Sequence, residues 1–389
     1  MDESIAGPHG RPECPPHLLP LRERVRGFLR EHVLPWEDDL DGGDTARGAD
    51  IRRKAKAAGL WGLPLPDELG GGALGLGDYA HIAEVEGSSD HGPSLLGSAS
   101  LLDVNTLARH AAPAVRDRYA ARLASGELAM CNAMTEPDVP GSDPTLVTTT
   151  ATRRPDGTWL VTGRKWFVTG AGHAGLAAVL ARTSGASGER DGLSVLLVPT
   201  GADGFEIVRE LPVLGAGGQW EIALHGVTVP GDHVLGEPGR GLRVAGDRVR
   251  LGRLLRCLRW LGQAQRAYDL MCDRARARRT AAGRLGDLQH VQRHLFESLL
   301  SLRTTRPLVF EAVGRVEAGR DARTETALAK VAAARTLHEV TDAAVQVYGA
   351  EGLGPDTALP ALLRAGRAAR LLDGPDELHF GTVARRALG

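Results

Sequence analysis

Two short stretches of this chain carry residue types that could do chemistry. The first reads L-L-D-G-P-D-E-L-H and places the carboxylate of Asp373 directly before a Gly-Pro pair. A carboxylate can accept a proton as a general base. An Asp before Gly-Pro is also ordinary turn chemistry, because Asp caps its own backbone, Gly adopts unusual dihedrals and Pro fixes φ. Taken alone, this segment favours a turn.

The second stretch lies in the middle of the chain. It reads T-E-P-D-V-P-G-S-D from Thr135 onwards, and G-R-K-W-F-V-T-G-A-G follows at 163–172. Gly and Pro hold such a loop in a fixed conformation with exposed backbone N–H groups, which suit an anion or the polar edge of a ring. Either segment alone could be a plain hairpin loop. Together they indicate a binding site on a β domain.

The surrounding sequence predicts an α+β fold with three regions that differ in sequence pattern. From about Leu18 to Gly126 apolar residues recur at helical spacing. Between about Leu128 and Leu235 short β-like runs alternate with Gly-rich turns, which indicates a small barrel or sandwich. After Gly241 four long helices rich in Ala, Leu and Arg are predicted, which can form a bundle. We therefore expect an N-terminal α-helical domain (1–126), a middle β-barrel domain (127–236) and a C-terminal four-helix bundle (237–389).

Composition excludes several function classes. The chain has 389 residues, and its 47 Lys and Arg against 48 Asp and Glu give a formal net charge of -1. These charges are spread through helices, which argues against a nucleic-acid partner. The four cysteines form no C-x-x-C pair and have no neighbouring His at ligand spacing, so we expect no metal and a reduced cytoplasm. The first residues lack a signal pattern, and no long apolar run is present, so we expect neither secretion nor a membrane span.

Several motifs, taken in order, resemble the acyl-CoA dehydrogenase family, flavoproteins that remove hydrogen from the α and β carbons of acyl thioesters. The middle motifs match its T-E-P-x-(x)-G-S-D loop and the W-containing segment that lies against the flavin. Further matches are K-A-A-G-L-W-G-L-P-L-P-D-E-L-G-G-G at 56–72, L-G-Q-A-Q-R-A-Y at 261–268 and V-Q-V-Y-G-A-E-G at 345–352. The resemblance extends from about Leu18 to Leu388.

One branch of that family is resembled more specifically. The extra residue in T-E-P-D-V-P-G-S-D, the segment L-G-R-L-L-R-C-L-R at 251–259 and D-G-P-D-E-L-H at 373–379 are similar to the ten/eleven-like group, which carries Asp where most relatives carry Glu. The resemblance makes Asp373 the catalytic base. Some relatives place the base elsewhere, at a position that is Gly252 here and has no side chain, which strengthens the assignment to Asp373.

The reaction implied by this resemblance is α,β-desaturation of an acyl thioester by an FAD-dependent acyl-CoA dehydrogenase, an enzyme of fatty acid metabolism. Asp373 would abstract the α-proton, and the β-hydride would pass to flavin N5. The backbone N–H of Asp373 and a flavin ribityl hydroxyl would bind the thioester oxygen. Removal of one such donor typically costs about two to three orders of magnitude in rate.

The resemblance also assigns binding residues. Thr135 would meet the flavin pyrimidine edge, Thr169 would lie near N5, and Phe167 would lie on the ring face where relatives more often have Trp. Each has a structural alternative: a capped turn, an ordinary strand residue or a core aromatic. The full set of cofactor-binding residues is Met134, Thr135, Gly141, Ser142, Phe167, Val168, Thr169, Arg279, Gln346, Gly349, Ala350, Pro375, Asp376 and Glu377. The substrate-binding residues are Ser142, Arg253 and Gly374.

Two positions depart from the family pattern. Ala282 stands where relatives often have Phe, in a segment that is one residue shorter, and Ala350 stands for the second Gly of a Gly-Gly pair. The added methyl group of Ala350 narrows the approach of the backbone to a phosphate. We therefore expect weakened FAD affinity.

The implied partners are an acyl-CoA or acyl-carrier-protein thioester and an electron-transfer flavoprotein or similar acceptor. A homodimer or homotetramer is also implied, because Arg279 and Gln346 lie where relatives reach a neighbouring subunit's FAD. Two alternatives stay open. One is a flavin-dependent oxidase or monooxygenase on the same fold, similar to nitroalkane oxidases with an Asp base, which oxygen reactivity would distinguish. The other is a non-catalytic acyl-thioester-binding partner, which the absence of bound flavin would indicate.

Overall fold

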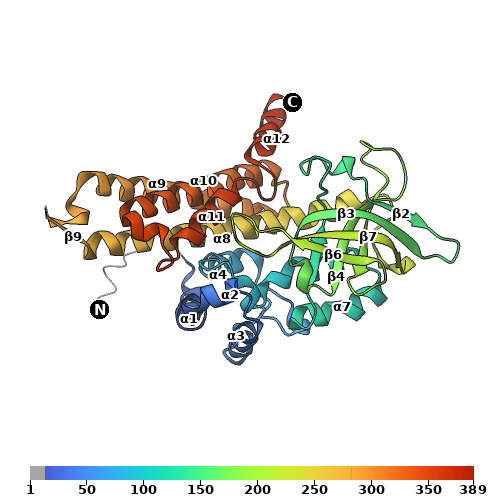
Figure 1. Ribbon diagram of the computed structural model, residues 1–389, viewed down its shortest axis with the longest axis horizontal. Coiled ribbons are helices and arrows are strands. Elements are labelled where there is room, and N and C mark those ends of the chain that lie inside the picture. Colours follow the sequence, from blue (N-terminus) through green and yellow to red (C-terminus); the bar gives the residue numbers. More distant parts are fainter. Residues whose placement is uncertain (1–13, 282) are drawn as a thin grey trace. The chain divides into compact units, whose positions relative to one another are not determined.

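The computed structural model describes residues 14–389 except 282 (Figure 1). Its contacts divide the chain into two compact units. The helical unit comprises the described residues up to Leu60 together with Leu74–Leu96 and Gly252–Gly389. The sheet unit comprises Trp61–Ala73 and Gly97–Leu251. These units follow contacts rather than position along the chain, so the three predicted domain boundaries stay predictions.

The helical unit is built from helices at both ends of the chain. Its N-terminal helices are α1 (Leu19–His32), α2 (Glu37–Asp41), α3 (Thr45–Ala57), α4 (Leu76–Glu86) and α5 (Gly92–Leu95). Its C-terminal part contains the greater portion of α8 (Gly241–Ala277), then α9 (Gln289–Glu317), α10 (Arg323–Tyr348), α11 (Leu359–Ala369) and α12 (Asp376–Leu388). A two-stranded hairpin, β9 (Arg279–Thr280) and β10 (Gly283–Arg284), joins α8 to α9.

Helix α10 is the centre of the C-terminal part and packs against α9, α11 and α12 (Figure 1). Many of its buried residues are alanines, which let neighbouring helices approach closely. Gly366 of α11 shows how close this approach is, because a Cβ there would lie 2.9 Å from Cα of His338. On α9, buried Arg306 donates to Glu84 of α4 and so ties the two ends of the chain together.

The sheet unit contains α6 (Leu101–His110), α7 (Pro113–Ser125), a sheet of eight strands and the first part of α8. The strand order is β6-β7-β3-β2-β4-β5-β8, and β1 pairs with β4. The strands are β1 (Met130–Ala133), β2 (Thr150–Arg153), β3 (Trp159–Thr169), β4 (Leu176–Arg182), β5 (Leu193–Pro199), β6 (Phe205–Glu210), β7 (Gln219–Val229) and β8 (Val234–Leu235).

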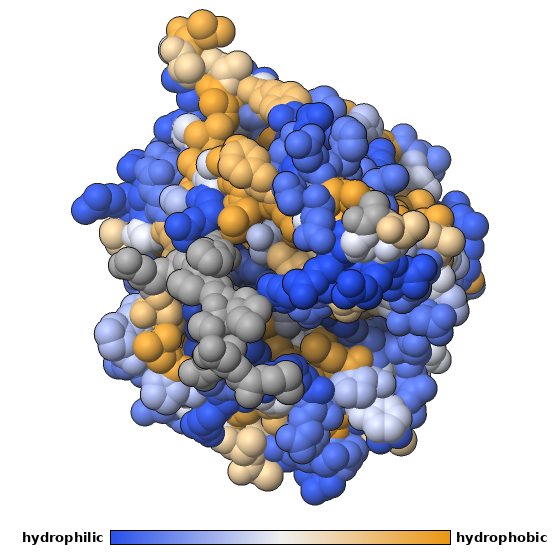
Figure 2. Space-filling view, turned by 90° about the vertical axis from the view of Figure 1, so that its left-hand side faces the viewer, coloured by the Kyte–Doolittle hydropathy of each residue, from blue (hydrophilic) through white to orange (hydrophobic). Residues whose placement is uncertain are grey.

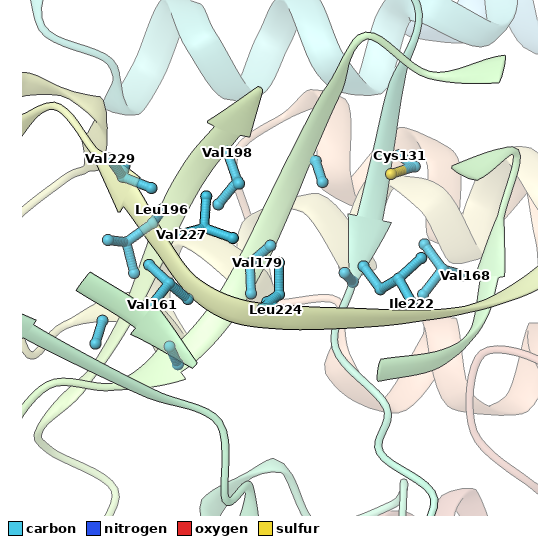
Figure 3. Close-up of a cluster of buried hydrophobic side chains, with 14 of the residues drawn as sticks. Cys131, Val161, Val168, Val179, Leu196, Val198, Ile222, Leu224, Val227 and Val229 are labelled. Atoms are coloured by element: carbon cyan, nitrogen blue, oxygen red, sulfur yellow. The ribbon is translucent and has the colours of Figure 1, made fainter. Parts of the chain in front are cut away.

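Strand β4 is covered on both faces, which explains its unbroken apolar run. Successive side chains of a strand point to opposite faces. Val179 belongs to a cluster with Val161, Leu196 and Ile222 (Figure 3), whereas Leu180 packs in a second cluster with residues of α6 and α7. A strand buried on both faces reads as continuously hydrophobic rather than alternating.

The predicted order of helices, sheet and helices is confirmed, with two differences. Among the described residues the end strands β6 and β8 do not pair with each other, so the middle sheet is not the closed barrel that the sequence suggested. Strand patterning indicates buried faces but does not report whether the last strand meets the first. The C-terminal part also has a fifth helix, α12, which begins after Pro375 with Asp376 and Glu377 in its first turn, a favourable arrangement at a helix N-terminus.

Candidate active site

The Asp373 turn links α11 to α12 in a strained backbone conformation. Asp373 has φ of +55° and Gly374 has φ of +96°. Left-handed backbone costs a non-glycine residue roughly 1–2 kcal/mol, although Asp tolerates it better than most. In the described part of the chain only four non-glycine residues have positive φ, and two of them, Asp373 and Phe167, were predicted site residues. Such outliers persist where surrounding structure holds them, often at functional sites.

Arg253 and His379 hold this turn. The Nε of Arg253 donates to the carbonyl oxygen of Asp373 at 2.9 Å, and the Nε2 of His379 lies 3.3 Å from the same oxygen. Burial and the nearby cations Arg253 and Lys330 lower the pKa of His379 to about 4, so its imidazole is neutral at neutral pH and can donate as the Nε2–H tautomer. A Cβ at Gly374 would lie 2.8 Å from Leu378, so the turn leaves little room there for a larger residue.

The carboxylate of Asp373 keeps an open acceptor. Its Oδ2 atom is buried and has no hydrogen-bond donor among the described residues. Arg256 places its Nε 3.2 Å from that atom as an ion pair. Nearby Cys257 is no competing nucleophile, because burial and the charge of Asp373 raise the pKa of its thiol to about 12. The turn thus presents a carboxylate oxygen that pairs with Arg256 and accepts no hydrogen bond among the described residues.

Asp376, three residues later, has a different environment. Its carboxylate is buried and accepts a hydrogen bond from Nε of Arg370 at 3.0 Å. Lys330 and Arg335 lie 3.5 and 3.6 Å from it. Three cationic side chains therefore lie around the Asp376 carboxylate. Each carboxylate has one buried oxygen without a hydrogen-bond partner among the described residues, Oδ2 of Asp373 and Oδ1 of Asp376. The two differ in their ion pairs, because Asp373 pairs with Arg256 and Asp376 lies against three cationic side chains.

The other predicted residues of this turn and its neighbouring helix lie close by. Pro375 occupies the N-cap position of α12, and Glu377 is exposed in its first turn. Arg253 is partly buried on α8. Burial lowers its pKa below the ordinary value, although the nearby Asp373 opposes this shift. The sequence analysis named Arg253 but not Arg256, which lies one turn further along α8. Their spacing of three residues places them on one helix face and was the available signal.

In the sheet unit, the Thr135 loop is fastened to β3. The backbone N–H of Trp166 donates to the carbonyl of Thr135 at 3.0 Å. Lys165 donates to the carbonyl of Met134 at 3.0 Å. A Cβ at Gly141 would lie 2.8 Å from the Thr135 methyl group, so this loop folds closely on itself. Gly141 and Ser142 are exposed, as a binding loop requires.

Strand β3 bulges where the predicted flavin residues lie. Its register with β7 shifts between Lys165 and Val168. Phe167, in this bulge, has φ of +47° and exposes 47% of its surface. Val168 faces the core, so only its backbone can contact a ligand. Thr169 is exposed and donates to Oε1 of Gln219 at 3.0 Å.

The remaining predicted residues lie at one end of the helical unit. Arg274 near the end of α8 donates to the carbonyl of Tyr348, so the ends of α8 and α10 meet. Arg279 follows α8 in the β9 hairpin, and Gln346 lies in the last turn of α10; both are exposed, as are Gly349 and Ala350 just after α10. Ala282 lies outside the described residues. The structure therefore gathers Arg279 with the Gln346–Ala350 segment at the helix ends.

The sheet unit fits a flat aromatic group with polar edges. It presents an exposed aromatic ring at Phe167, an exposed hydroxyl at Thr169 and an exposed Gly-Ser loop. Beside them, the indole N–H of Trp166 is buried without an acceptor among the described residues. A buried donor without a partner is costly, which favours a ligand that supplies an acceptor. The residues present are therefore compatible with a flavin.

A carboxylate turn before the last helix and a Thr-Glu-Pro loop on a central sheet, flanked by helices at both ends of the chain, define a flavoprotein dehydrogenase class. Three family models match the chain in succession: the acyl-CoA dehydrogenase N-terminal domain at residues 16–127, the middle domain at 131–227 and the C-terminal domain at 239–388. The chain belongs to the acyl-CoA dehydrogenase family, a family of FAD-dependent oxidoreductases. The predicted family and fold class are confirmed.

Individual relatives agree with this assignment. The chain is 35% identical over 392 residues to the probable acyl-CoA dehydrogenase FadE2 of Mycobacterium tuberculosis, with 95% of both chains covered. It is 32% identical to acyl-CoA dehydrogenase family member 11 of Mus musculus, and the alignment covers 94% of this chain but only 49% of the Mus musculus protein. The chain therefore spans about half the length of the member 11 relatives that it matches.

Solved structures show the same fold. A homologue from Mycobacterium abscessus, also of the acyl-CoA dehydrogenase type, has a TM-score of 0.89 and 30% identity, covering 96% of this chain and 98% of that one. No helix in the described part of the present chain is long and apolar enough to cross a membrane.

Proposed function

We propose that this chain is an FAD-dependent acyl-thioester dehydrogenase whose catalytic base is Asp373. One observation carries the proposal: Asp373 has a left-handed backbone in a turn whose carbonyl is held by Arg253, and its carboxylate pairs with Arg256 but accepts no hydrogen bond among the described residues. Family membership supplies the reaction class, and the turn supplies the base.

Different residues of this chain have different roles in the proposed reaction. The Asp373 carboxylate accepts the α-proton as the α C–H bond breaks, and the backbone N–H of Asp373 donates to the thioester carbonyl. Such a donor stabilises the negative charge that develops on that oxygen. Bound FAD supplies the acceptor for the β-hydride at N5. Arg253 and Gly374 position the turn, and Ser142 contacts the carrier arm of the substrate.

Flavin binding is proposed for three groups of residues. The loop contributes Met134, Thr135, Gly141 and Ser142, and the β3 bulge contributes Phe167, Val168 and Thr169. Pro375, Asp376 and Glu377 follow the base. Arg279, Gln346, Gly349 and Ala350 would bind the adenylate half of FAD in a neighbouring subunit.

A homo-oligomer is part of the proposal, because exposed apolar residues interrupt the hydrophilic surface of the helical unit (Figure 2). Phe296 and Leu300 on α9 expose 67% and 50% of their surface, and Leu353 after α10 exposes 69%. Exposed apolar patches of this kind mark interaction sites. Dilution of a flavin-loaded oligomer to monomers should then release FAD. Tight FAD retention by a demonstrated monomer would contradict a shared cofactor site.

Anaerobic bleaching of protein-bound flavin tests the proposed activity. Purified protein is mixed with acyl thioesters of different chain length, carried by CoA or by acyl carrier protein. Bleaching by a thioester, with slow reoxidation by oxygen and fast reoxidation by an electron-transfer flavoprotein, is the expected result. Rapid peroxide formation would instead indicate an oxidase. Protein that binds FAD but is reduced by no thioester would refute the proposal.

A further inference from the structure

An ion pair is buried beneath the proposed flavin loop. Lys165 on β3 is fully buried, with an exposed fraction of 0%, and its Nζ lies 2.9 Å from Oε1 of Glu136. Glu136 is itself only 2% exposed. Within β3, the side chain of Lys165 lies on the inward face with Val161, two alternations earlier. The sequence analysis assigned this pair no role.

Glu136 makes further bonds to the segment that leads into β2. Its Oε2 accepts from the N–H and hydroxyl of Thr148, both at 2.7 Å. Its Oε1 also accepts from the N–H of Thr149 at 2.9 Å. The carboxylate therefore joins three segments: its own loop, the 148–149 segment and β3.

Lys165 donates hydrogen bonds to the residues on both sides of Thr135, a proposed flavin-binding residue. It donates to the carbonyl of Met134, the residue before, and to the side chain of Glu136, the residue after. The next residue of β3, Trp166, donates its backbone N–H to the carbonyl of Thr135. Phe167 follows at the exposed end of the bulge. One ammonium group thus fixes the loop and the start of the bulge together.

Stability alone is a weak reason to bury such a pair. Taking two charges out of water is expensive, and replacement of a buried ion pair by apolar residues is often neutral or stabilising. The desolvation of the ammonium group lowers the pKa of Lys165, although the charge of Glu136 opposes this shift. What an apolar pair could not supply is the set of directional bonds to Met134 and the Thr148–Thr149 segment.

We propose that Lys165 is a positioning residue that, through Glu136, holds the Met134–Glu136 loop and the Trp166–Phe167 bulge in the conformation that binds the flavin. The inference rests on the proposed function, because that proposal supplies FAD as the ligand. The conformation of the loop is a property of the protein without cofactor and can be tested independently.

Three variants test the role of the pair. Lys165→Met leaves Glu136 buried without a counterion, and Glu136→Gln does the same to Lys165. The double variant Glu136→Gln/Lys165→Met removes both charges and avoids an unpaired buried charge. Glu221→Gln is the matched control. Glu221 is a fully buried carboxylate of the same sheet that pairs with Arg209 and Arg164. In the part of the chain that the structure describes, its ion-pair partners lie outside the Met134–Glu136 loop.

The readouts are apoprotein melting temperature, hydrogen exchange of loop amides and FAD dissociation constant. We expect both single variants to melt earlier and the double variant to recover most of that loss. In the double variant the amides of Thr148, Thr149 and Trp166 should still exchange at least about tenfold faster, and FAD should bind at least about tenfold more weakly, since bonds to charged groups are lost. Glu221→Gln should keep wild-type loop exchange and FAD affinity.

Two results would overturn the proposal. One is a double variant with wild-type loop exchange and FAD affinity, which would show that the pair contributes to folding alone. The other is an equal loss of loop protection in Glu221→Gln, which would show a general loosening of the sheet. A wild-type chain that binds no FAD would refute the proposed function instead, and the exchange data on apoprotein would still decide whether Lys165 fixes the loop.

Discussion

The carbonyl oxygen of Asp373 accepts a hydrogen bond from Nε of Arg253 at 2.9 Å, across a separation of 120 residues. This bond orients the main chain of the turn, while Oδ2 of the Asp373 carboxylate is left without a hydrogen-bond donor among the described residues. The location of the proposed base is therefore set by its backbone. Its carboxylate stays available for a proton.

Asp373→Asn should separate catalysis from folding. The amide preserves the size of the side chain and can still cap the turn, but it cannot accept the α-proton. We expect normal melting temperature and FAD content, with anaerobic flavin reduction slowed at least about 10²-fold, the lower end of general-base contributions. Reduced stability with activity in proportion to folded protein would show a turn-only Asp. Asp373→Glu, which is chemically competent but longer, should be impaired to a smaller extent.

Arg253→Met should weaken the turn without removing the base. The lost bond joins a charged donor to a carbonyl, and such bonds contribute about 1.5–3 kcal/mol to stability. We expect slower flavin reduction with an unchanged spectrum of bound FAD. Arg259→Met is the control, because Arg259 lies on the same helix and pairs with Asp90 instead. Equal effects of the two variants on reduction would contradict a specific role of Arg253.

Asp376→Asn should act on stability more than Asp373→Asn does. Asp376 is buried beside Lys330, whose side chain is also fully buried and whose pKa is lowered by burial. Loss of the carboxylate leaves that ammonium uncompensated, which typically costs about 3–5 kcal/mol. Urea unfolding of the two Asn variants measures the difference. Recovery of stability in Asp376→Asn/Lys330→Met would confirm the cause, and wild-type stability of Asp376→Asn would exclude it.

The sequence predicts the elements around the site better than the partners of its charged residues. The apolar runs of β4 and β5 and the D-G-P turn are local patterns, so periodicity and turn chemistry located them. The partners of Lys165 and Arg256 come from segments far away in the chain. The position of Lys165 on the inward face of β3 indicates that its ammonium group needs an acceptor, but only the fold shows that Glu136 is that acceptor.

The open sheet and the details of the flavin surface were beyond local patterns for a similar reason. Closure of a sheet depends on whether β6 reaches β8, which neither strand encodes alone. The outward turn of Phe167 depends on the register shift between β3 and β7. The resemblance to a family supplied these residues as candidates, and their predicted contacts with FAD stay predictions.

Acid should weaken the Lys165–Glu136 connection in a predictable direction. Burial raises the pKa of Glu136, but the Lys165 charge and its hydrogen bonds outweigh this and hold it below the ordinary value of 4.5. The contribution of Glu136 to stability is therefore complete above pH 4.5 and is lost as pH falls through its folded-state pKa. We expect the apoprotein of Glu136→Gln/Lys165→Met to lose less stability than wild type between about pH 6 and about pH 3. An identical loss in both proteins would assign acid sensitivity to other carboxylates, for example Glu221, whose pKa is also lowered.

Thr169 and Gln219 offer the last test, because the Thr169 hydroxyl donates to Oε1 of Gln219 at 3.0 Å. If Thr169 donates to flavin N5, near which the resemblance places it, this hydroxyl has to turn away from Gln219. Thr169→Val removes the donor and should slow flavin reduction about tenfold, the effect of losing about 1.4 kcal/mol of transition-state stabilisation, at full FAD occupancy. Gln219→Leu removes the competing acceptor and should leave the reduction rate at or above wild type. If the hydroxyl only joins β3 to β7, both variants will lose similar stability and neither will change the reduction rate. Stopped-flow reduction at saturating thioester, with melting temperatures of both variants, distinguishes these outcomes.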